Sequence, residues 1–310
     1  MIRIFLLVFT FTVFIFPLEA TGSQEAPSPL RFGLVTAADA LPAMLARDRG
    51  YFALEGVEVD LILFYNPQER DAAIQAGQLD GAISDLLAAF FFAAAGFDFR
   101  ITSLTSGRFG LAGSPQSEIS TLAGLQGRRV GFFPNTMTQY IADSLLGAAG
   151  VAMTDYEGVP VPNIRIRLEM LMNGLIDAAV LPEPLLTVAV SQGAALIAST
   201  DGTELVSGTF YFSRNVLENR LDEVKAFHRA YYRAVRAINA DPDSFRDYLV
   251  ERVGFPQAVR DSFEFFTFNK PELPTEQQLR RAHDWLRARR LLSAEISHPN
   301  LIDARPTADW

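Results

Sequence analysis

The 310-residue sequence contains no cysteine and three histidines, the first of which is His228. The absence of cysteine excludes disulfides, thiolate nucleophiles and cysteine-ligated zinc sites. None of the histidines has the spacing of a zinc-binding pair such as His-x-x-x-His, and no dinucleotide-binding, phosphate-loop or Gly-x-Ser-x-Gly motif is present. We therefore expect no metal, no cofactor and no catalytic residues.

Positive charge is outnumbered: 27 Lys and Arg residues stand against 36 Asp and Glu, which gives a formal net charge of −9. This balance argues against a nucleic-acid partner, because neutralising phosphates requires clustered basic side chains. It does not suggest binding to an anionic membrane surface either. The hydrophobic fraction of 49% is enough for a large core, and the length is sufficient for two lobes.

One long apolar run, Ile4 to Leu18, lies near the N terminus. It follows Arg3 and precedes small residues, which is typical of a secretory signal cleaved after Ala20 or Gly22. A retained membrane anchor is the alternative, although about 15 apolar residues are few for a span that needs about 20. The polar residues 23–29 would then form a flexible leader.

The most informative stretch is 163–193. Apolar residues at helical spacing lead to Gly174, a short apolar run covers 176–181, and Pro182–Pro184 precede a second apolar helix. This order predicts a helix–strand–helix crossover of a mostly parallel sheet. The two prolines restrict the backbone around Glu183 and place it at the carboxyl end of the strand, the edge at which open α/β sheets bind ligands.

A short internal repeat accompanies this crossover. Gly77-x-x-Asp80 and Gly174-x-x-Asp177 each join a predicted helix to a short strand, and they lie 97 residues apart (177 minus 80). Two similar α/β lobes would produce such a repeat. We expect the two aspartates to be turn or capping residues rather than ligand contacts.

Four motifs in order resemble those of the type II periplasmic solute-binding proteins of ABC importers. Within that family they resemble the branch that handles thiamine pyrimidine precursors, riboflavin, nitrate, taurine and alkanesulfonates. The resemblance covers roughly residues 31–200, and its motifs are 49–59, 76–82, 125–131 and 163–193. It implies an α/β protein of the type II periplasmic binding fold: two α/β lobes, a hinge, an intervening ligand cleft and a helical C-terminal cover.

The resemblance also implies a function and a location. We expect a periplasmic or otherwise extracytoplasmic monomer that captures a small-molecule ligand by hinge closure and delivers it to an ABC transporter permease. Without cysteine the protein would not be a lipoprotein. An extracytoplasmic ligand sensor or interaction module on the same fold is the alternative.

The resemblance, together with the glycines and prolines that interrupt helices and strands, predicts the lobe boundaries. We expect residues 1–22 to be the signal peptide, 23–111 the first part of lobe 1, 112–206 lobe 2, and 207–310 the return strand and C-terminal helices of lobe 1. The hinge should lie near 107–113 and 206–209. Beyond residue 221 the pattern predicts helices, including 243–253, 256–263 and 275–290.

Polar residues at the predicted strand–helix junctions are the candidate ligand contacts, because unpaired amides and short side chains converge there. Each has an ordinary structural explanation as well: helix capping, a solvated turn or, for the aromatic residue, core packing. Thr136 with Gln139 three residues later is also a capping-box pattern. The candidate ligand-binding residues are Asp39, Ser84, Asp85, Asn135, Thr136, Thr138, Glu183 and Tyr211.

Three of these candidates, Asp39, Asp85 and Glu183, are carboxylates, and they favour a neutral or cationic ligand that donates hydrogen bonds. A nitrogen-containing heteroaromatic such as a thiamine precursor therefore comes first and a riboflavin-like ring second. A sulfonate, nitrate or taurine site would need more Arg, Lys or amide donors. Eukaryotic pyrimidine synthases of this fold carry a cysteine-rich motif and an active-site histidine. This sequence has no cysteine at all and no histidine before His228, so we do not expect an enzyme.

Overall fold

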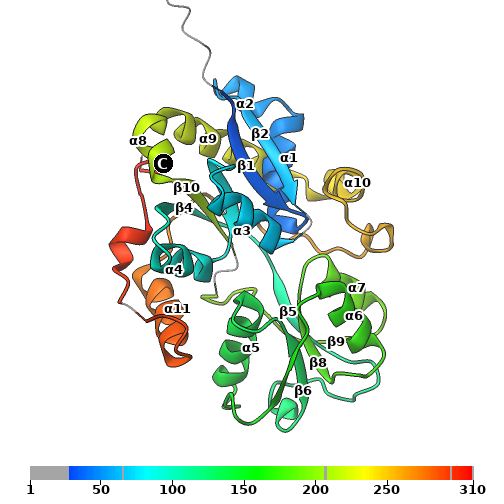
Figure 1. Ribbon diagram of the computed structural model, residues 1–310. Helices are drawn as coiled ribbons and strands as arrows, with labels where there is room; N and C mark the ends of the chain where they lie inside the picture. Colours follow the sequence, from blue (N-terminus) through cyan, green and yellow to red (C-terminus); the bar gives the residue numbers. More distant parts are fainter. Residues whose placement is uncertain (1–27, 65, 206–207, 294, 309–310) are drawn as a thin grey trace, which may run out of the picture.

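The computed structural model describes residues 28–64, 66–205, 208–293 and 295–308. Within these residues two five-stranded sheets, each covered by helices, form two lobes (Figure 1). This arrangement confirms the predicted two-lobed α/β fold. The predicted signal segment and residues 206–207 of the predicted hinge lie outside the described residues. Among the helices described, none combines the length and hydropathy that a bilayer-spanning segment needs.

The first sheet has the strand order β2-β1-β3-β10-β4. β1 pairs in parallel with β2 and β3, whereas β10 is antiparallel to both of its neighbours. The strands are β1 (Leu30–Val35), β2 (Val59–Phe64), β3 (Gly81–Ser84), β4 (Phe99–Thr105) and β10 (Gly208–Ser213). The interior strand β10, between β3 and β4, is the predicted return strand, so the first lobe is completed by residues that follow the second.

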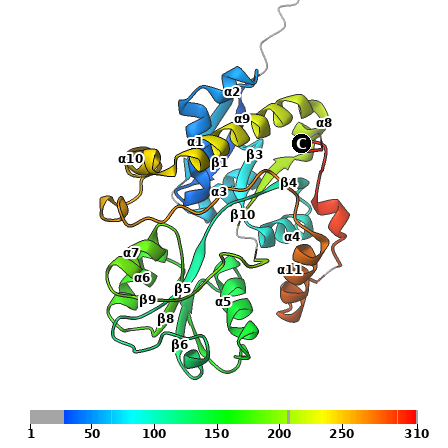
Figure 2. The same cartoon turned by 180° about the vertical axis from the view of Figure 1, so that it is seen from behind.

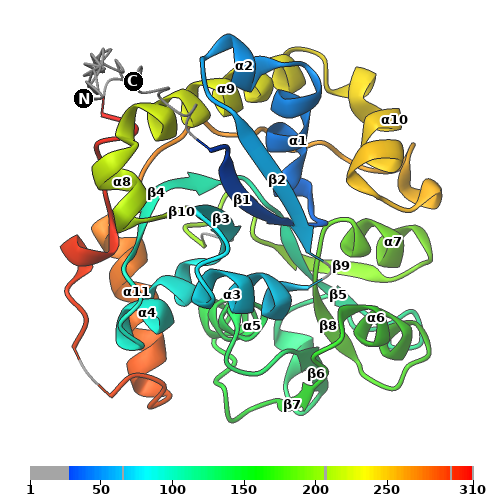
Figure 3. The same ribbon diagram turned by 45° about the horizontal axis from the view of Figure 1, so that its top comes forward.

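Helices cover both faces of the first sheet (Figure 3). The core on one face includes side chains from α1, α2 and α9, and the core on the other includes side chains from α3 and α4. The helices of this part are η1 (Ala38–Ala40), α1 (Leu41–Asp48), α2 (Tyr51–Leu54), α3 (Pro67–Gln75) and α4 (Leu86–Ala94). Each crossover places a helix start just beyond the carboxyl end of a strand.

The second sheet has the order β7-β6-β8-β5-β9, in which β5 is antiparallel to both of its neighbours. The predicted helix–strand–helix crossover is confirmed as α6, β8 and α7; strands β5 and β7 were not predicted. The strands are β5 (Phe109–Gly113), β6 (Arg129–Phe132), β7 (Glu157–Pro160), β8 (Ala178–Pro182) and β9 (Ala195–Ser199). The helices are η2 (Ala123–Leu125), α5 (Met137–Ala148), α6 (Ile164–Met172) and α7 (Leu185–Ser191).

The C-terminal part is largely helical, as predicted, with one correction. Residues 256–263 were expected to form a helix but contain only the short turn η5, because Phe255, Phe263 and Phe268 enter the core of the first lobe from an irregular chain. The elements are α8 (Arg214–Asn219), α9 (Leu221–Ala240), η3 (Pro242–Phe245), α10 (Arg246–Tyr248), η4 (Leu249–Val253), η5 (Gln257–Val259), α11 (Glu276–Ala288) and η6 (His298–Leu301).

Helix α11 links the two lobes (Figure 2). It packs on α4 of the first lobe, and its Trp285 ring meets Tyr140 of α5 edge-on at 5.4 Å between ring centroids. The buried Asp143 of α5 accepts hydrogen bonds from Trp285 Nε1 at 2.8 Å and from Arg289 Nη2 at 2.6 Å. The C-terminal part therefore restrains the second lobe at a point outside the connecting strands.

The Gly-x-x-Asp repeat has the same role in both lobes. The backbone N–H of Arg31 donates to Asp80 Oδ2 at 2.8 Å, and the backbone N–H of Arg129 donates to Asp177 Oδ2 at 2.8 Å. Each arginine side chain also pairs with the same carboxylate. Both aspartates thus hold the start of a strand, as expected for turn residues.

Candidate functional site

The carboxyl edges of the two sheets adjoin one another. In the first crossing, Thr105 ends β4 and residues 106–108 lead to Phe109, which pairs with Pro182 at the carboxyl end of β8. In the second, the chain leaves β9 and returns to Gly208, which pairs with Thr105. Because both crossings join a carboxyl edge to a carboxyl edge, side chains from the two lobes can meet one ligand there.

On the first lobe, Asp39 follows β1 in the turn η1. Its Oδ2 accepts a hydrogen bond from Thr105 Oγ1 at 3.3 Å, whereas its buried Oδ1 has no partner among the described residues. Burial raises the pKa of Asp39 to about 6. Gly208 leaves room for this pair: a β-carbon there would lie 2.2 Å from Thr105 Oγ1 and 3.0 Å from Asp39 Oδ2. One carboxylate oxygen is therefore free to accept a hydrogen bond from a ligand.

Ser84 and Asp85 lie beside Asp39, at the end of β3. The buried Arg70 of α3 donates to Ser84 Oγ at 2.7 Å and to the carbonyl of Ile83 at 2.9 Å. Asp85 caps α4 by accepting from the amide of Ala88 at 3.0 Å. Burial raises the pKa of Asp85, and the Arg70 guanidinium opposes that shift.

Tyr211 is fully buried on β10, beneath the edge. Its ring meets Phe92 edge-on and its hydroxyl donates to the backbone carbonyl of Asp85 at 2.5 Å. The hydroxyl therefore holds the start of α4, and the ring packs in the core.

On the second lobe, the candidates gather at the start of α5. Thr136 Oγ1 donates to the carbonyl of Phe133 at 2.7 Å, and Thr138 Oγ1 accepts from the amide of Phe133 at 2.9 Å. Both hydroxyls therefore turn back toward the end of β6. The preceding Asn135 has a φ of 59°, in the left-handed region, and its backbone N–H donates to Gln139 Oε1 at 2.7 Å.

The capping box predicted for Thr136 and Gln139 is therefore wrong. Gln139 reaches the backbone amide of the residue before the N-cap, and the Thr136 side chain, which lies 3.0 Å from Thr138 Oγ1, accepts no hydrogen bond from a backbone amide of the first turn. The backbone amides of residues 136–138 have no acceptor within the described part of the chain. These N–H groups, at the positive end of the α5 dipole, are suited to an oxygen acceptor.

A buried arginine, which the sequence reading missed, lies behind the edge of each lobe. Arg167 of α6 is 1% exposed and donates to the carbonyls of Val161 and Val180 at 2.8 Å each, and burial lowers its pKa to about 10. Arg70 is 4% exposed and donates to a carbonyl at the corresponding end of β3. Each arginine precedes the repeated aspartate by ten residues (80 minus 70; 177 minus 167), and that shared spacing is the signal that would have identified them.

Glu183 is buried, and its carboxylate is occupied by protein groups. Oε1 accepts from Arg108 at 2.9 and 2.6 Å, and Oε2 accepts from the amide and hydroxyl of Thr187 at 3.1 and 2.8 Å. Arg108 lies in the first crossing, and it also donates to the carbonyl of Glu264 at 3.2 Å. The Glu183–Pro184 peptide bond is cis. Glu183 thus links the first crossing between the lobes, through Arg108, to the turn after β8.

The histidines lie away from both carboxyl edges. His228 of α9 is buried and its Nε2 lies 2.9 Å from Thr102 Oγ1. In the C-terminal part, His283 Nδ1 lies 2.9 Å from His298 Nε2. Within the residues that the structure describes, no group of three or more His, Cys, Asp or Glu side chains is arranged to hold a metal ion.

Comparison with known proteins gives one family match and many structural neighbours. The sequence model of the family described as "NMT1/THI5 like" matches residues 37–245. The 4-amino-5-hydroxymethyl-2-methylpyrimidine phosphate synthase of Schizosaccharomyces pombe is 25% identical over an alignment of 252 residues that covers 72% of this chain and 69% of the relative.

Two solved structures illustrate the structural similarity. The periplasmic aliphatic sulphonate-binding protein SsuA of Escherichia coli has a TM-score of 0.79 at 16% identity, over 89% of this chain and 98% of the other. The alkanesulfonate-binding protein SsuA of Xanthomonas axonopodis pv. citri, bound to MOPS, has a TM-score of 0.73 at 20% identity, over 91% and 98%. At these identities the similarity establishes the periplasmic binding-protein fold and leaves the ligand open.

Proposed function

The chain belongs to the NMT1/THI5-like family and has the periplasmic binding-protein fold, and from this premise we propose that it is the extracytoplasmic solute-binding component of an ABC importer. It binds a small molecule between the two carboxyl edges and presents it to a permease. The two crossings between the lobes, at 106–108 and 200–205 among the described residues, act as the hinge. Closure about them brings both edges onto the ligand, so ligand binding favours the closed form.

The observation that carries the proposal is the contrast between the groups left unused at the two edges. Lobe 1 presents the unpartnered Oδ1 of Asp39, an acceptor. Lobe 2 presents the amides at the start of α5, which are donors. This pairing suits a ligand with a hydrogen-bond donor at one end and an oxygen acceptor at the other. A nitrogen heteroaromatic such as 4-amino-5-hydroxymethyl-2-methylpyrimidine carries an amino group and a hydroxyl and satisfies both.

A sulfonate ligand is the second candidate, and specific observations favour it. The buried guanidiniums of Arg70 and Arg167 lie behind the two edges, and the α5 amides suit an anionic oxygen. Two structural neighbours are named as sulfonate-binding proteins. An aminoalkanesulfonate such as taurine also offers a donor and an acceptor, whereas a plain alkanesulfonate leaves Asp39 unsatisfied.

Catalysis is less well supported than binding. The yeast relative is named as a synthase, but the chain has no cysteine and its histidines lie on α9 and in the C-terminal part. Neither carboxyl edge carries a histidine or a thiol as a nucleophile or general base. A binding role needs only the groups described above.

A thermal-shift screen of the purified protein tests the proposal. The panel contains thiamine precursors, flavins, purines, pyrimidines, polyamines, nitrate, taurine and alkanesulfonates. A ligand at about 100 times its Kd stabilises the folded state by about 2.7 kcal/mol, which raises the Tm by several degrees. We expect a nitrogen heterocycle to give the shift and Asp39→Ala to abolish it. A response to plain sulfonates or nitrate alone would contradict the heteroaromatic assignment, and no response at all would contradict the importer proposal.

A further inference from the structure

An irregular stretch of the C-terminal part, residues 263–272, runs along the first crossing between the lobes, and we call it the backing segment. The backbone N–H of Leu104, near the end of β4, donates to the carbonyl of Glu272 at 2.7 Å. Two residues later, Ser106 Oγ accepts a hydrogen bond from the backbone N–H of Asn269 at 2.7 Å. The chain therefore enters the crossing antiparallel to the backing segment, which supports it from one side.

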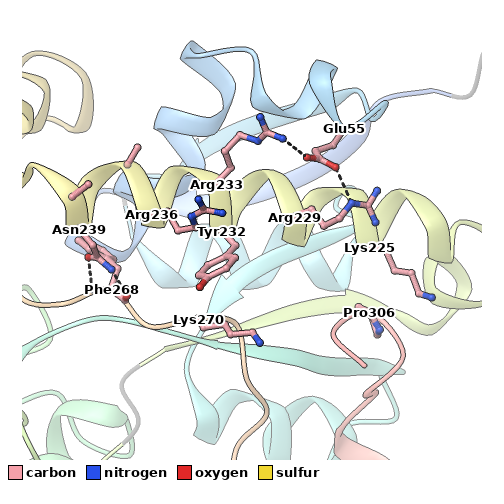
Figure 4. Close-up of a pocket in the computed structure, with 12 residues that line it drawn as sticks. Glu55, Lys225, Arg229, Tyr232, Arg233, Arg236, Asn239, Phe268, Lys270 and Pro306 are labelled. Carbon is pink, nitrogen blue, oxygen red and sulfur yellow. Dashed lines mark hydrogen bonds and ion pairs between the residues drawn. The ribbon is translucent and has the colours of Figure 1, made fainter. Parts of the chain in front are cut away.

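The backing segment is fixed to the first lobe. Its Phe263 and Phe268 side chains are 1% and 2% exposed and belong to the core that includes side chains from α1, α2 and α9. The Asn239 side chain of α9 accepts from the backbone N–H of Phe268 at 3.0 Å and donates to its carbonyl at 2.8 Å (Figure 4). Because buried rings and paired hydrogen bonds hold the segment, we expect it to move with lobe 1.

Arg108, the last residue of the first crossing, is held by the second lobe. Its backbone carbonyl accepts from the N–H of Glu183 at 3.0 Å, and its guanidinium donates twice to Glu183 Oε1, at 2.9 and 2.6 Å. Nη1 of Arg108 also lies 3.5 Å from Oδ2 of Asp201, which follows β9. Glu183 is buried and is bonded in turn to Thr187 of α7. We therefore expect Arg108 to move with lobe 2.

The same guanidinium reaches the backing segment of lobe 1. Nη2 of Arg108 donates to the carbonyl of Glu264 at 3.2 Å. The guanidinium carbon lies 6.0 Å from the centroid of the Phe263 ring and 5.8 Å from that of the Phe266 ring. This hydrogen bond is longer than those to Glu183, and both ring distances are close to the limit of about 6 Å for cation–π attraction. A rotation of lobe 2 therefore alters the contacts with lobe 1 first, while the pair with Glu183 stays intact.

We propose that Arg108 is a positioning residue for the cleft between the lobes: it moves with lobe 2 and, through its contacts with the backing segment, favours the arrangement of the lobes seen in this structure. The inference rests on the proposed function, in which ligand affinity depends on closure. Contacts that differ between two arrangements of the lobes shift their populations by the difference in free energy. Packing of α7 on η5 and of α11 on α5 also joins the lobes, but the Arg108 contact lies on the crossing itself.

Double electron–electron resonance measures the arrangement of the lobes directly. The chain has no cysteine, so nitroxide labels attach only at the introduced Gln75→Cys on α3 and Glu169→Cys on α6, which are exposed positions on lobe 1 and lobe 2. The ligand-free protein is measured first, so this arm of the experiment does not require the cleft ligand to be known. We expect one dominant distance between the labels, and it should match the structure.

Two test variants weaken the Arg108 contact, and one control leaves it in place. Phe266→Leu removes a ring beside the guanidinium, and Arg108→Gln with Glu183→Gln replaces the charged pair by amides that still form hydrogen bonds. The matched control, Phe265→Leu, removes a neighbouring ring that lies 5.6 Å from the guanidinium carbon of Arg246 instead. We expect the population at the wild-type distance to fall by about twofold or more in both test variants and to stay nearly unchanged in the control.

Titration with 4-amino-5-hydroxymethyl-2-methylpyrimidine gives the second readout, and the distances fix its sign. If the ligand keeps the wild-type distance in the wild-type protein, its affinity should fall in the test variants. If the ligand shifts that distance, its affinity should rise in the test variants, because the arrangement that competes with binding has been weakened. A change in affinity of the opposite sign would overturn the inference.

The ligand-free distances separate a positioning role from a merely structural one. Thermal unfolding shows whether each variant is folded. Lower thermal stability without any change in distance would show that Arg108 only stabilises the fold, and this result would overturn the inference. An equal change of distance in Phe265→Leu would overturn it too. Absence of pyrimidine binding would contradict the proposed ligand instead, and the ligand-free distances alone would then decide the role of Arg108.

Discussion

The two lobes follow the same plan but carry different charges at their carboxyl edges. In each lobe an arginine at the start of a strand pairs with the aspartate of a Gly-x-x-Asp motif, and a buried arginine ten residues before that aspartate donates to a strand carbonyl. In lobe 1 burial raises the pKa values of Asp39 and Asp85, and the buried Arg70, which pairs with Asp71, partly offsets both rises. In lobe 2 the hydrogen bonds of Arg167 all go to backbone carbonyls.

This difference separates structural interactions from functional ones. Interactions that occur in both lobes hold the shared scaffold, because both lobes need them whatever they bind. The lobe 1 edge carries an unpartnered carboxylate oxygen, Asp39 Oδ1, whereas at the lobe 2 edge the carboxylate of Glu183 is occupied by protein groups and the amides at the start of α5 are unused. We infer that the unshared groups determine the ligand and the shared groups determine stability.

The largest expected effect on stability comes from replacing the two buried arginines, and the two replacements should differ in cost. Arg70→Leu should destabilise the protein by about 3 kcal/mol or more at pH 7, because buried carboxylates lose their counter-charge. Arg167→Leu should cost about 2 kcal/mol, because two carbonyls lose donors while an uncompensated buried charge is removed. Urea unfolding at pH 7 and pH 5 checks this. The cost of Arg70→Leu should fall at pH 5, where protonation begins to remove the carboxylate charge, and equal costs at both pH values would contradict the comparison.

The next prediction concerns Asp39. Its pKa of about 6 is above the ordinary value of 3.8, so the native state holds the proton more tightly than the unfolded state does. Ionisation of this buried group therefore costs stability as pH rises from about 4 to about 6, by up to about 3 kcal/mol above that range. Asp39→Asn should stabilise the protein at pH 7.5 by about 1 to 3 kcal/mol and have little effect at pH 3.5. A loss of stability at pH 7.5 would show that the charge is well compensated.

The shared aspartates should behave alike. Asp80→Asn and Asp177→Asn should each cost about 1 to 2 kcal/mol, because each breaks an ion pair and weakens a bond to a strand amide. For Asp177, whose pKa is lowered by Arg129, the contribution is full at neutral pH and is lost as pH falls through the folded pKa. Urea unfolding at pH 7 measures both variants. Costs that differ by more than about 1 kcal/mol would mean that the repeat is not equivalent in the two lobes.

The smallest effect is expected at Asn135, before α5. Asn135→Ala should cost about 1 kcal/mol, because alanine is disfavoured at a φ of 59°, whereas Asn135→Gly should be close to neutral. Thermal unfolding measures the difference, and the affinity for the cleft ligand should fall in the alanine variant alone. Equal stability of the two variants would show that backbone conformation does not limit this edge.

Much of the fold was predictable because the spacing of apolar residues and the glycines and prolines that end helices and strands act locally. The 163–193 stretch gave α6, β8 and α7, and the Gly-x-x-Asp repeat indicated two lobes. β5 was not predicted, because Gly110 and Gly113 interrupt its apolar pattern. A β-carbon at Gly113 would lie 2.6 Å from the carbonyl oxygen of Ile119, and one at Gly110 would lie 2.6 Å from the Leu186 side chain. That packing depends on residues that come together only in the folded protein.

The site was less predictable than the fold, because partners distant in sequence decide which groups are free. Glu183 was a plausible ligand contact until Arg108, 75 residues earlier, was seen to bind it. The buried arginines were missed because a charged residue within a helical pattern ordinarily faces solvent. Asp39 and the start of α5 were predicted as candidate ligand contacts because strand–helix junctions follow from local sequence, and their role in binding stays a prediction.

Isothermal titration calorimetry with 4-amino-5-hydroxymethyl-2-methylpyrimidine tests the central claim, that unequal groups on the two lobes bind one ligand. The titration compares the wild-type protein with Asp39→Asn at pH 7.5, and adds the wild type at pH 5. We predict saturable binding that weakens about tenfold or more in the variant, and that weakens at pH 5 because Asp39 becomes protonated. Equal affinity in both proteins, or tight binding of ethanesulfonate in place of the pyrimidine, would contradict the claim.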